Sequence, residues 1–381
     1  YGRRYLHFKP GFRLGGRGDV RILVATIPDA PPLDPAKNAD CLKLATQVGE
    51  LVLERSLDDV DVWAYDGKAG IAHFLFDLFA ATKDARWREA ATGLIEEASK
   101  TALTQASSGL YVGKAGVGQV ALVARQVTGD DTWLERAKAL AASLGDPEGT
   151  DVISGAAGTG IFLLNLHRVT GEKAHLDAAR DLGRYLVEHA VERDGMAHWP
   201  LRADQETVYV GFSHGAAGIG YFLSHLGRAT GDAVFAELAR KAAAFVIDCA
   251  EDDAPDGWKW TKRDPPARDS YPVQWCHGAP GIGIFFLALA DETGEPTHEA
   301  ALARCVAATR RRGRTARAGG CICHGRAGNA DFLLEVGRAR DDAALIADAR
   351  AFAPDLIDGH AVKTAVGERE YGPGLMTGLA G

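Results

Sequence analysis

The chain repeats one arrangement of polar and apolar residues along most of its length. Each unit begins at a Gly-x-x-Gly sequence, continues as an apolar stretch such as residues 160–166, and then reaches a turn such as Thr170-Gly171-Glu172. The first glycines stand at positions 67, 113, 155, 215, 278, 325 and 378, so successive units begin 42 to 63 residues apart. Repeats of this length are typical of stacked helical hairpins.

Each unit contains two apolar patterns, which predict two different helices. The stretch directly after the glycines is apolar nearly all round, and this predicts a buried helix. After the turn, apolar residues recur three and four positions apart, as at Leu176, Ala179, Leu182 and Leu186, which predicts an amphipathic helix. Long strand-like alternation is absent from the sequence. The amphipathic helix should therefore cover the buried one.

Seven such hairpins in an open row would leave an apolar face exposed at each end. Closure into a ring covers both faces, so we predict an all-α fold, an α/α toroid with inner and outer rings of helices. The glycines would then let inner backbones approach closely, although they could instead only permit tight turns. Because the sequence stops at Gly381, the second glycine of the seventh unit, we expect the seventh hairpin to be truncated.

The length of 381 residues would allow two domains, but the continuous repeat favours one large domain over residues 41–381. Residues 1–40 fit no repeat and indicate a linker or the edge of an upstream region. The chain begins without Met and ends inside a repeat, so we expect it to be part of a longer protein.

Composition excludes several classes of function. The net charge of -8 argues against nucleic acid as a main partner. No apolar stretch is long enough to span a membrane, and no signal peptide is visible. Six cysteines are too few for a disulfide scaffold in a chain of this size, which predicts a cytoplasmic protein.

Two cysteines and a histidine occupy matching places in adjacent units. Cys276 and Cys323 each lie two residues before the first glycine of their unit, and His324 follows Cys323. Two thiolates and one imidazole predict a zinc site with one coordination position open, as in catalytic zinc centres. The alternative is that these cysteines are small buried hydrophobes. That interpretation is the one we give to Cys41, Cys249 and Cys305.

A histidine and an aspartate predict acid–base chemistry near the same centre. His214 immediately precedes the fourth glycine pair, and Asp151 lies four residues before Gly155. A carboxylate beside an imidazole fixes its tautomer and raises its basicity, although a lone histidine is more often structural. The sequence leaves His277 open as a hydrogen-bonding group, an acid–base group or a spare ligand. Cys321 is a competing thiol that lies out of register.

Four segments that carry these residues resemble the motifs of the LanC family of lanthionine cyclases. They are residues 151–158 (DVISGAAG), 211–218 (GFSHGAAG), 275–281 (WCHGAPG) and 323–325 (CHG), and residues 373–381 (PGLMTGLAG) resemble the last repeat of that family. The residues of these motifs are most similar to those of the C-terminal cyclase domain of LanM-type, class II synthetases. A detached cyclase and the cyclase domain of a kinase-containing synthetase are the alternatives.

The resemblance implies an α/α toroid that holds one zinc ion through Cys276, Cys323 and His324, with Asp151 and His214 in the active site. The implied reaction adds a cysteine thiolate of a dehydrated, ribosomally made precursor peptide to dehydroalanine or dehydrobutyrine, forming a thioether ring. It also implies an upstream dehydratase or kinase domain in the full-length protein. In one departure, Pro272 stands where some members carry an arginine four residues before the first zinc cysteine, and Arg268 lies nearby.

Other functions remain as alternatives at this point. LanC-like proteins that add glutathione to dehydroamino acids share the WCHGAPG string. A carbohydrate-active enzyme or a scaffold on the same fold would require paired acidic residues or no site at all. A basic run is either a solvated helix end or a rim that attracts an acidic leader peptide. This run consists of Arg310, Arg311, Arg312, Arg314 and Arg317.

Overall fold

The computed structural model describes residues 35–200, 208–265, 270–314, 320–354, 373–378 and 380. Arg268, Arg317 and Gly381, which entered the sequence analysis, lie outside the described residues. Within the described residues, six helical hairpins follow one another after an initial helix, α1 (Pro35–Leu53). The hairpins are α2 (Lys68–Thr82) with α3 (Ala85–Ala102), α4 (Lys114–Thr128) with α5 (Thr132–Ala142), α6 (Ala156–Thr170) with α7 (Lys173–Glu188), α8 (Ala216–Thr230) with α9 (Ala233–Asp248), α10 (Ala279–Thr293) with α11 (Pro296–Arg312), and α12 (Arg326–Ala339) with α13 (Ala343–Arg350).

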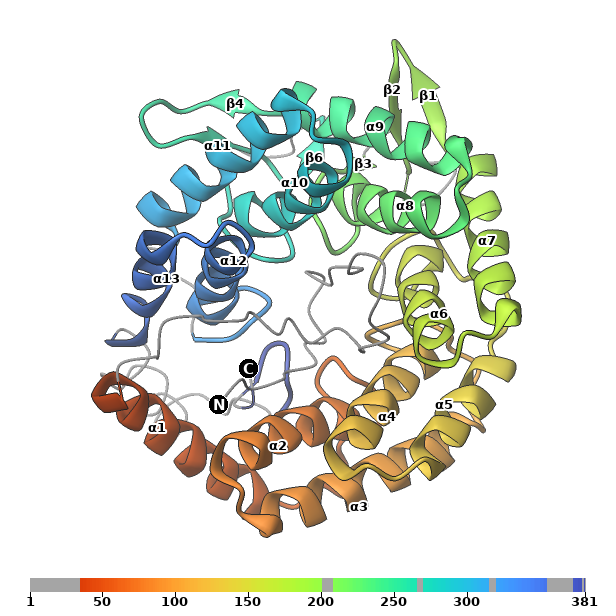
Figure 1. Ribbon diagram of the computed structural model, residues 1–381, viewed down its shortest axis with the longest axis vertical. Helices are drawn as coiled ribbons and strands as arrows, with labels where there is room; N and C mark the ends of the chain where they lie inside the picture. Colours follow the sequence, from red (N-terminus) through yellow and green to blue (C-terminus); the bar gives the residue numbers. More distant parts are fainter. Residues whose placement is uncertain are drawn as a thin grey trace.

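The hairpins form two concentric rings, and the predicted α/α toroid is confirmed. The first helix of each pair lies in the inner ring and the second lies outside it (Figure 1). Helix α1 lies at the periphery and contacts α2. It begins at Pro35, so the last residues of the segment predicted as a linker are helical. Of the seventh unit, residues 373–378 and 380 contain no helix.

The burial of each ring follows the two apolar patterns of the sequence. In the inner helix α6, residues 156–166 are all buried, whereas the outer helix α7 buries only Ala179, Gly183 and Leu186. Each large apolar side chain removed from water stabilises the fold by roughly 1.5–3 kcal/mol, so the inner ring carries most of the packing energy. Adjacent inner helices interlock, because Phe222 of α8 packs onto Gly160 of α6, where a Cβ would lie 2.2 Å from the ring.

Three small antiparallel sheets occupy the longer connections in the part of the chain that the structure describes. The sheets pair β1 (Val191–Arg193) with β2 (Met196–His198), β3 (Val208–Tyr209) with β6 (Arg263–Asp264), and β4 (Glu251–Asp252) with β5 (Trp258–Lys259). All six strands lie in the connections from α7 to α8 and from α9 to α10, which accounts for the longest spacings in the repeat. No helix of the described residues is both long and apolar enough to cross a membrane.

The loops that precede the inner helices are joined in a closed ring of backbone hydrogen bonds. All seven of its carbonyl acceptors, and all but one of its donors, lie two residues before the first glycine of a unit. The N–H to O=C bonds run Tyr65 to Tyr111 (2.9 Å), Tyr111 to Ile153 (2.9 Å), Val152 to Ser213 (3.1 Å), Ser213 to Cys276 (3.2 Å), Cys276 to Cys323 (3.3 Å), Cys323 to Met376 (2.9 Å) and Met376 to Tyr65 (2.8 Å). The ring gathers equivalent positions of distant repeats around one centre.

Gly218→Ala is expected to lower the free energy of unfolding by about 3 kcal/mol, because overpacked interiors must shift backbone. A Cβ at Gly218 would lie 1.9 Å from the carbonyl oxygen of Phe212, which is fixed in the loop before α8. The matched control is Gly93→Ala in α3, where nothing lies within 4 Å of an added Cβ. That change should stabilise the helix by about 0.5–1 kcal/mol. Urea unfolding measures both, and an unchanged midpoint for Gly218→Ala would show that the loop yields.

Candidate active site

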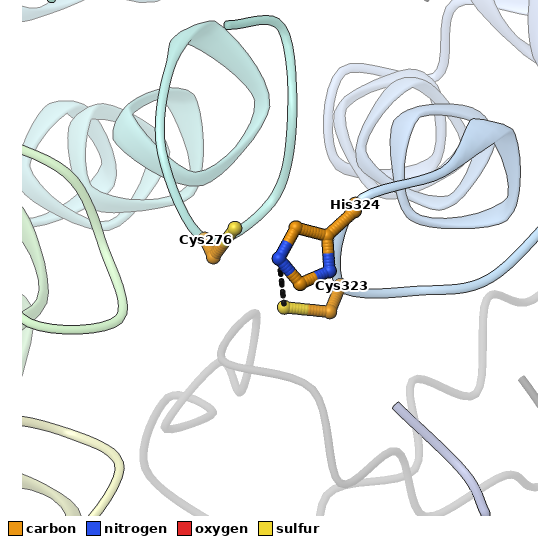
Figure 2. A group of neighbouring side chains, drawn as sticks. All are labelled: Cys276, Cys323 and His324. Carbon is orange, nitrogen blue, oxygen red and sulfur yellow. Dashed lines mark hydrogen bonds between the residues drawn. The ribbon is translucent and has the colours of Figure 1, made fainter. Parts of the chain in front are cut away.

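The structure brings together the three predicted metal ligands. Cys276 lies in the loop before α10, and Cys323 and His324 lie in the loop before α12 (Figure 2). One ligand atom from each residue, the two Sγ atoms and a ring nitrogen, all lie within 4.8 Å of one another. Both cysteines are buried and free of disulfides. Two soft thiolates and an imidazole at this spacing fit a zinc ion, and the set leaves room for a fourth ligand.

The two thiols of this cluster are electronically coupled. The hydrogen bond with Cys323 lowers the pKa of Cys276, against the opposing effect of burial, and the same contact raises the pKa of Cys323. The pair therefore loses its first proton, from Cys276, more easily than its second, from Cys323. Two hydrogen bonds raise the pKa of His324 to about 10. The one with Cys321 has the larger effect, and the one with Cys323 has the second largest. A metal ion would have to displace these protons, so binding should weaken in acid.

Asp151 and His214 form a hydrogen-bonded pair. Oδ2 of Asp151 lies 2.5 Å from Nδ1 of His214, and Oδ1 accepts from the backbone N–H groups of Ser154 (2.8 Å) and Gly155 (3.0 Å) at the start of α6. Burial pushes the pKa of Asp151 upward, but the contact with His214 and these N–H groups bring it below its usual value. An ionised Asp151 places the proton of neutral His214 on Nδ1, which leaves Nε2 for a substrate.

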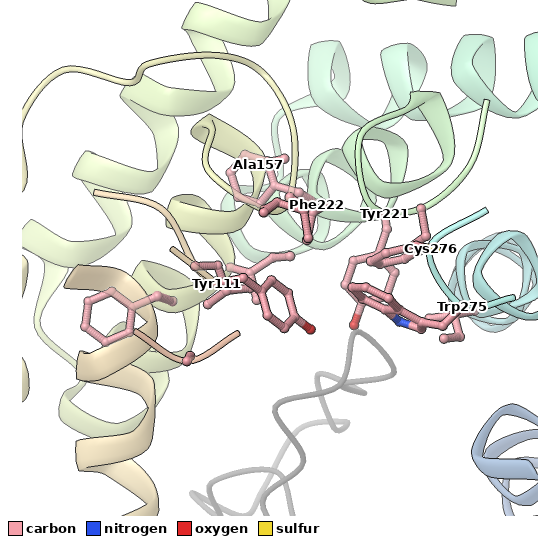
Figure 3. Packing of buried hydrophobic residues seen from close by; sticks show 14 of the residues in the cluster. Tyr111, Ala157, Tyr221, Phe222, Trp275 and Cys276 are labelled. Atoms are coloured by element: carbon pink, nitrogen blue, oxygen red, sulfur yellow. The ribbon is translucent and has the colours of Figure 1, made fainter. Parts of the chain in front are cut away.

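The metal-ligand cluster and His214 line the same cavity, which has a volume of about 140 Å³. Val112 and Ile153 supply an apolar part of the wall. Tyr111 and Trp275, the chain neighbours of the lining residues Val112 and Cys276, are buried in edge contact, with ring centres 5.4 Å apart (Figure 3). Close packing of this kind restricts the loops that carry the cavity-lining residues.

His277, which the sequence left open, lies in the cavity wall between the two groups. Its ring stacks on Tyr209, with centres 5.4 Å apart, and lies 6.3 Å from the ring of His214. Burial, followed by the charge of Lys262, lowers the pKa of His277 to about 3, so the ring is neutral. His277 is not part of the metal-ligand cluster among the described residues. Cys321 also lies outside that cluster but hydrogen-bonds to His324.

Tyr65 is a site residue that the sequence analysis missed. It lines the cavity, and its hydroxyl lies 3.0 Å from Sγ of Cys323. A signal was present, because Tyr65 stands two residues before Gly67 and so shares the register of Cys276 and Cys323. A tyrosine at such a place is more often a packing residue, and only the ring closure brings the first unit against the sixth.

The basic run at the end of α11 is largely neutralised within the chain. Three of its arginines form ion pairs at 2.7–3.0 Å, namely Arg310 with Asp348, Arg311 with Asp256 and Arg312 with Asp253. Exposed pairs of this kind contribute little stability, but they leave less free charge to attract a distant anion. The pairs favour the solvated helix end over a rim for an acidic leader peptide.

Comparisons with known proteins give one family and one fold. The model of the family described as lanthionine synthetase C-like protein matches residues 58–381. Among solved structures, nisin cyclase is similar over 91% of this chain and 92% of its own, with 18% sequence identity and a TM-score of 0.62. An unsaturated glucuronyl hydrolase from Bacillus sp. GL1, responsible for the degradation of glycosaminoglycan, is similar over 72% of this chain and 82% of its own, with 13% identity and a TM-score of 0.51. At these identities the structural likeness shows a shared fold.

Proposed function

The chain belongs to the lanthionine synthetase C-like family, and we propose that it is a zinc-dependent cyclase that forms lanthionine and methyllanthionine rings. One observation carries the proposal: the metal-ligand cluster and the Asp151–His214 pair meet at a single small cavity. The substrate would be a precursor peptide whose serine and threonine residues have already been dehydrated. A dehydrating activity must therefore act before this one, as the likeness to LanM-type synthetases also suggests.

Cys276, Cys323 and His324 would hold the zinc ion. When bound, zinc would supply a Lewis acid that lowers the pKa of a substrate thiol. The sulfur would add to the β-carbon of dehydroalanine or dehydrobutyrine, and the alkene electron pair would move onto the adjacent carbonyl as an enolate.

The proton from the thiol must end on the α-carbon, since the reaction is an addition with no net redox change. We assign the movement of this proton to Nε2 of His214, either from the thiol or to the enolate carbon. Asp151 holds the ring in the required tautomer and stabilises the imidazolium that forms in passing.

The size of the cavity indicates which part of a substrate enters it. A volume of about 140 Å³ suits a thiol side chain and one alkene rather than a folded peptide segment. The rest of the precursor would lie outside this cavity. This arrangement fits an enzyme that closes rings of different lengths, because only the two reacting groups need to be fixed.

The alternatives are less well supported. A glycosidase needs two carboxyl groups flanking the scissile bond. No carboxylate is among the described residues that line the cavity, so the carbohydrate-active alternative has no observation in its favour. Addition of glutathione would use the same metal and proton chemistry, and the product distinguishes it.

The direct test uses the zinc-loaded protein and a dehydrated precursor peptide. Cyclisation should leave the peptide mass unchanged while its cysteines lose reactivity toward N-ethylmaleimide, because each thiol becomes a thioether. Mass spectrometry with and without glutathione makes the comparison. A peptide that keeps its free thiols would contradict the proposal, and a gain of glutathione mass would favour the glutathione-adding alternative.

A further inference from the structure

The backbone of Tyr65 is held on both sides by the ring of loops. Its N–H donates to the carbonyl of Tyr111 at 2.9 Å, and its own carbonyl accepts from Met376 at 2.8 Å. The next residue, Asp66, accepts hydrogen bonds from the backbone N–H (3.0 Å) and the hydroxyl (2.5 Å) of Thr377. The phenol ring also packs edge-on against that of Tyr111, with centres 6.1 Å apart. The Tyr65 side chain is therefore fixed where the first and last described units meet.

The Tyr65 hydroxyl makes the two cysteine sulfurs unequal. It donates to Sγ of Cys323 across 3.0 Å, whereas the contact of the Cys276 sulfur with Oε1 of Gln274 is 3.8 Å long. A hydroxyl that donates to a thiolate withdraws electron density from the sulfur, and outer hydrogen bonds of this kind tune metal ligands. Cys323 should therefore be the poorer nucleophile of the two.

This difference matters because the cavity has to receive an electrophile. Cys323 and His214 line the same cavity, where the alkene of a dehydroamino acid would lie if the proposed function holds. A resident thiolate there competes with the substrate thiol for the β-carbon, and its addition would tether the peptide to the enzyme.

We propose that Tyr65 is a positioning residue that suppresses the nucleophilicity of Cys323 by hydrogen bonding to its sulfur. The substrate cysteine, which lacks that hydrogen bond, then remains the more reactive sulfur in the cavity. The proposal rests on the proposed function. It adds to that function a reason why Cys323 does not itself add to the β-carbon of the dehydroamino acid.

The experiment compares cobalt-substituted and zinc-loaded forms of the parent with Tyr65→Phe. Without the hydrogen bond the Cys323 sulfur is easier to oxidise, so the sulfur-to-cobalt charge-transfer band should move to lower energy. Alkylation of Cys323 by iodoacetamide in the zinc-loaded protein should become about tenfold faster, within the range of outer-shell effects. Peptide mapping by mass spectrometry assigns the alkylated cysteine.

The matched control is Tyr209→Phe, because the Tyr209 hydroxyl accepts from Arg263 at 2.7 Å, whereas the Tyr65 hydroxyl donates to Sγ of Cys323. It should leave the cobalt band and the alkylation rate as in the parent. An unchanged band and rate in Tyr65→Phe would overturn the proposal and reduce Tyr65 to a packing residue, with the cyclase assignment intact. A parent that takes up no cobalt would overturn the metal assignment itself.

A second variant covers the case in which Tyr65→Phe fails to fold or to load metal. Site-specific 3-fluorotyrosine at position 65 keeps the ring and is a stronger hydrogen-bond donor. Its cobalt band should move to higher energy and the alkylation of Cys323 should slow. A fluorotyrosine protein with the parent band and rate would overturn the proposal.

Discussion

Replacing Cys276 or Cys323 by alanine is expected to reduce zinc from about one ion per chain to nearly none and to abolish cyclisation. Each substitution leaves two protein ligands where a catalytic zinc site uses three. Cys321, the thiol that hydrogen-bonds to His324, lies outside the cluster of possible metal ligands, so we do not expect it to replace the lost sulfur. Zinc content by mass spectrometry and thiol loss from a dehydrated peptide are the two readouts.

The matched control is Cys41→Ala, since Cys41 lies on α1 outside the cluster. The interpretation of Cys41 as a buried hydrophobe was wrong, because its side chain is exposed. Cys41→Ala should keep full zinc and full activity, which separates loss of a ligand from loss of any thiol. Zinc retained at the parent level in both Cys276→Ala and Cys323→Ala would end the zinc hypothesis. Zinc lost from all three would point to a general loss of folding, which circular dichroism can detect.

The helical repeat was predictable from sequence because its causes are local. An apolar stretch followed by an amphipathic one specifies a buried and a covering helix wherever it occurs, and the need to cover both ends of the row favours a ring. The sequence left the role of the glycines open. At Gly218 and Gly160 the structure shows close approach, once of a backbone carbonyl and once of a phenyl ring from the next helix.

The features that escaped prediction depend on partners far away in the chain. The ring of backbone hydrogen bonds joins loops that are up to 311 residues apart, as the neighbouring Asp66–Thr377 contact shows. Arg310 and Arg312 form ion pairs with Asp348 and Asp253, which lie outside α11. The sequence shows the basic run but not these distant partners. Short strands such as β3 and β6 carry too few residues for a period-two pattern to be recognised.

The candidate site was more predictable than the strands, because its residues share a register with the glycines. Cys276 and Cys323 hold the same place in their units, and His214 stands beside that place in another. The structure brings these residues to one cavity. Their chemical roles stay predictions. Tyr65 shares the register too, but only the geometry of ring closure assigns its hydroxyl to Cys323.

His214→Asn is expected to keep zinc and to lower the rate of cyclisation by about 10²–10⁴-fold, the usual contribution of a positioned acid–base group. Asparagine preserves the approximate size of the ring but cannot carry a proton between the thiol and the α-carbon. His214 lies outside the metal-ligand cluster among the described residues, so the metal should be unaffected. Asp151→Asn should act in the same direction with a smaller loss, because it removes the charge that stabilises the imidazolium.

The control for these variants is His189→Asn, since His189 is exposed at the end of α7, far in sequence from the loops that line the cavity. Its Nδ1 lies 2.8 Å from the backbone carbonyl of Tyr185, and its ring stacks on that of Tyr185. The turnover and zinc content of this control should match the parent. If His214→Asn turned over at the parent rate, the histidine would be structural and the proton would move by another route. If it lost zinc instead, His214 would be a metal ligand, because an acid–base group that does not touch the metal can be replaced without releasing it.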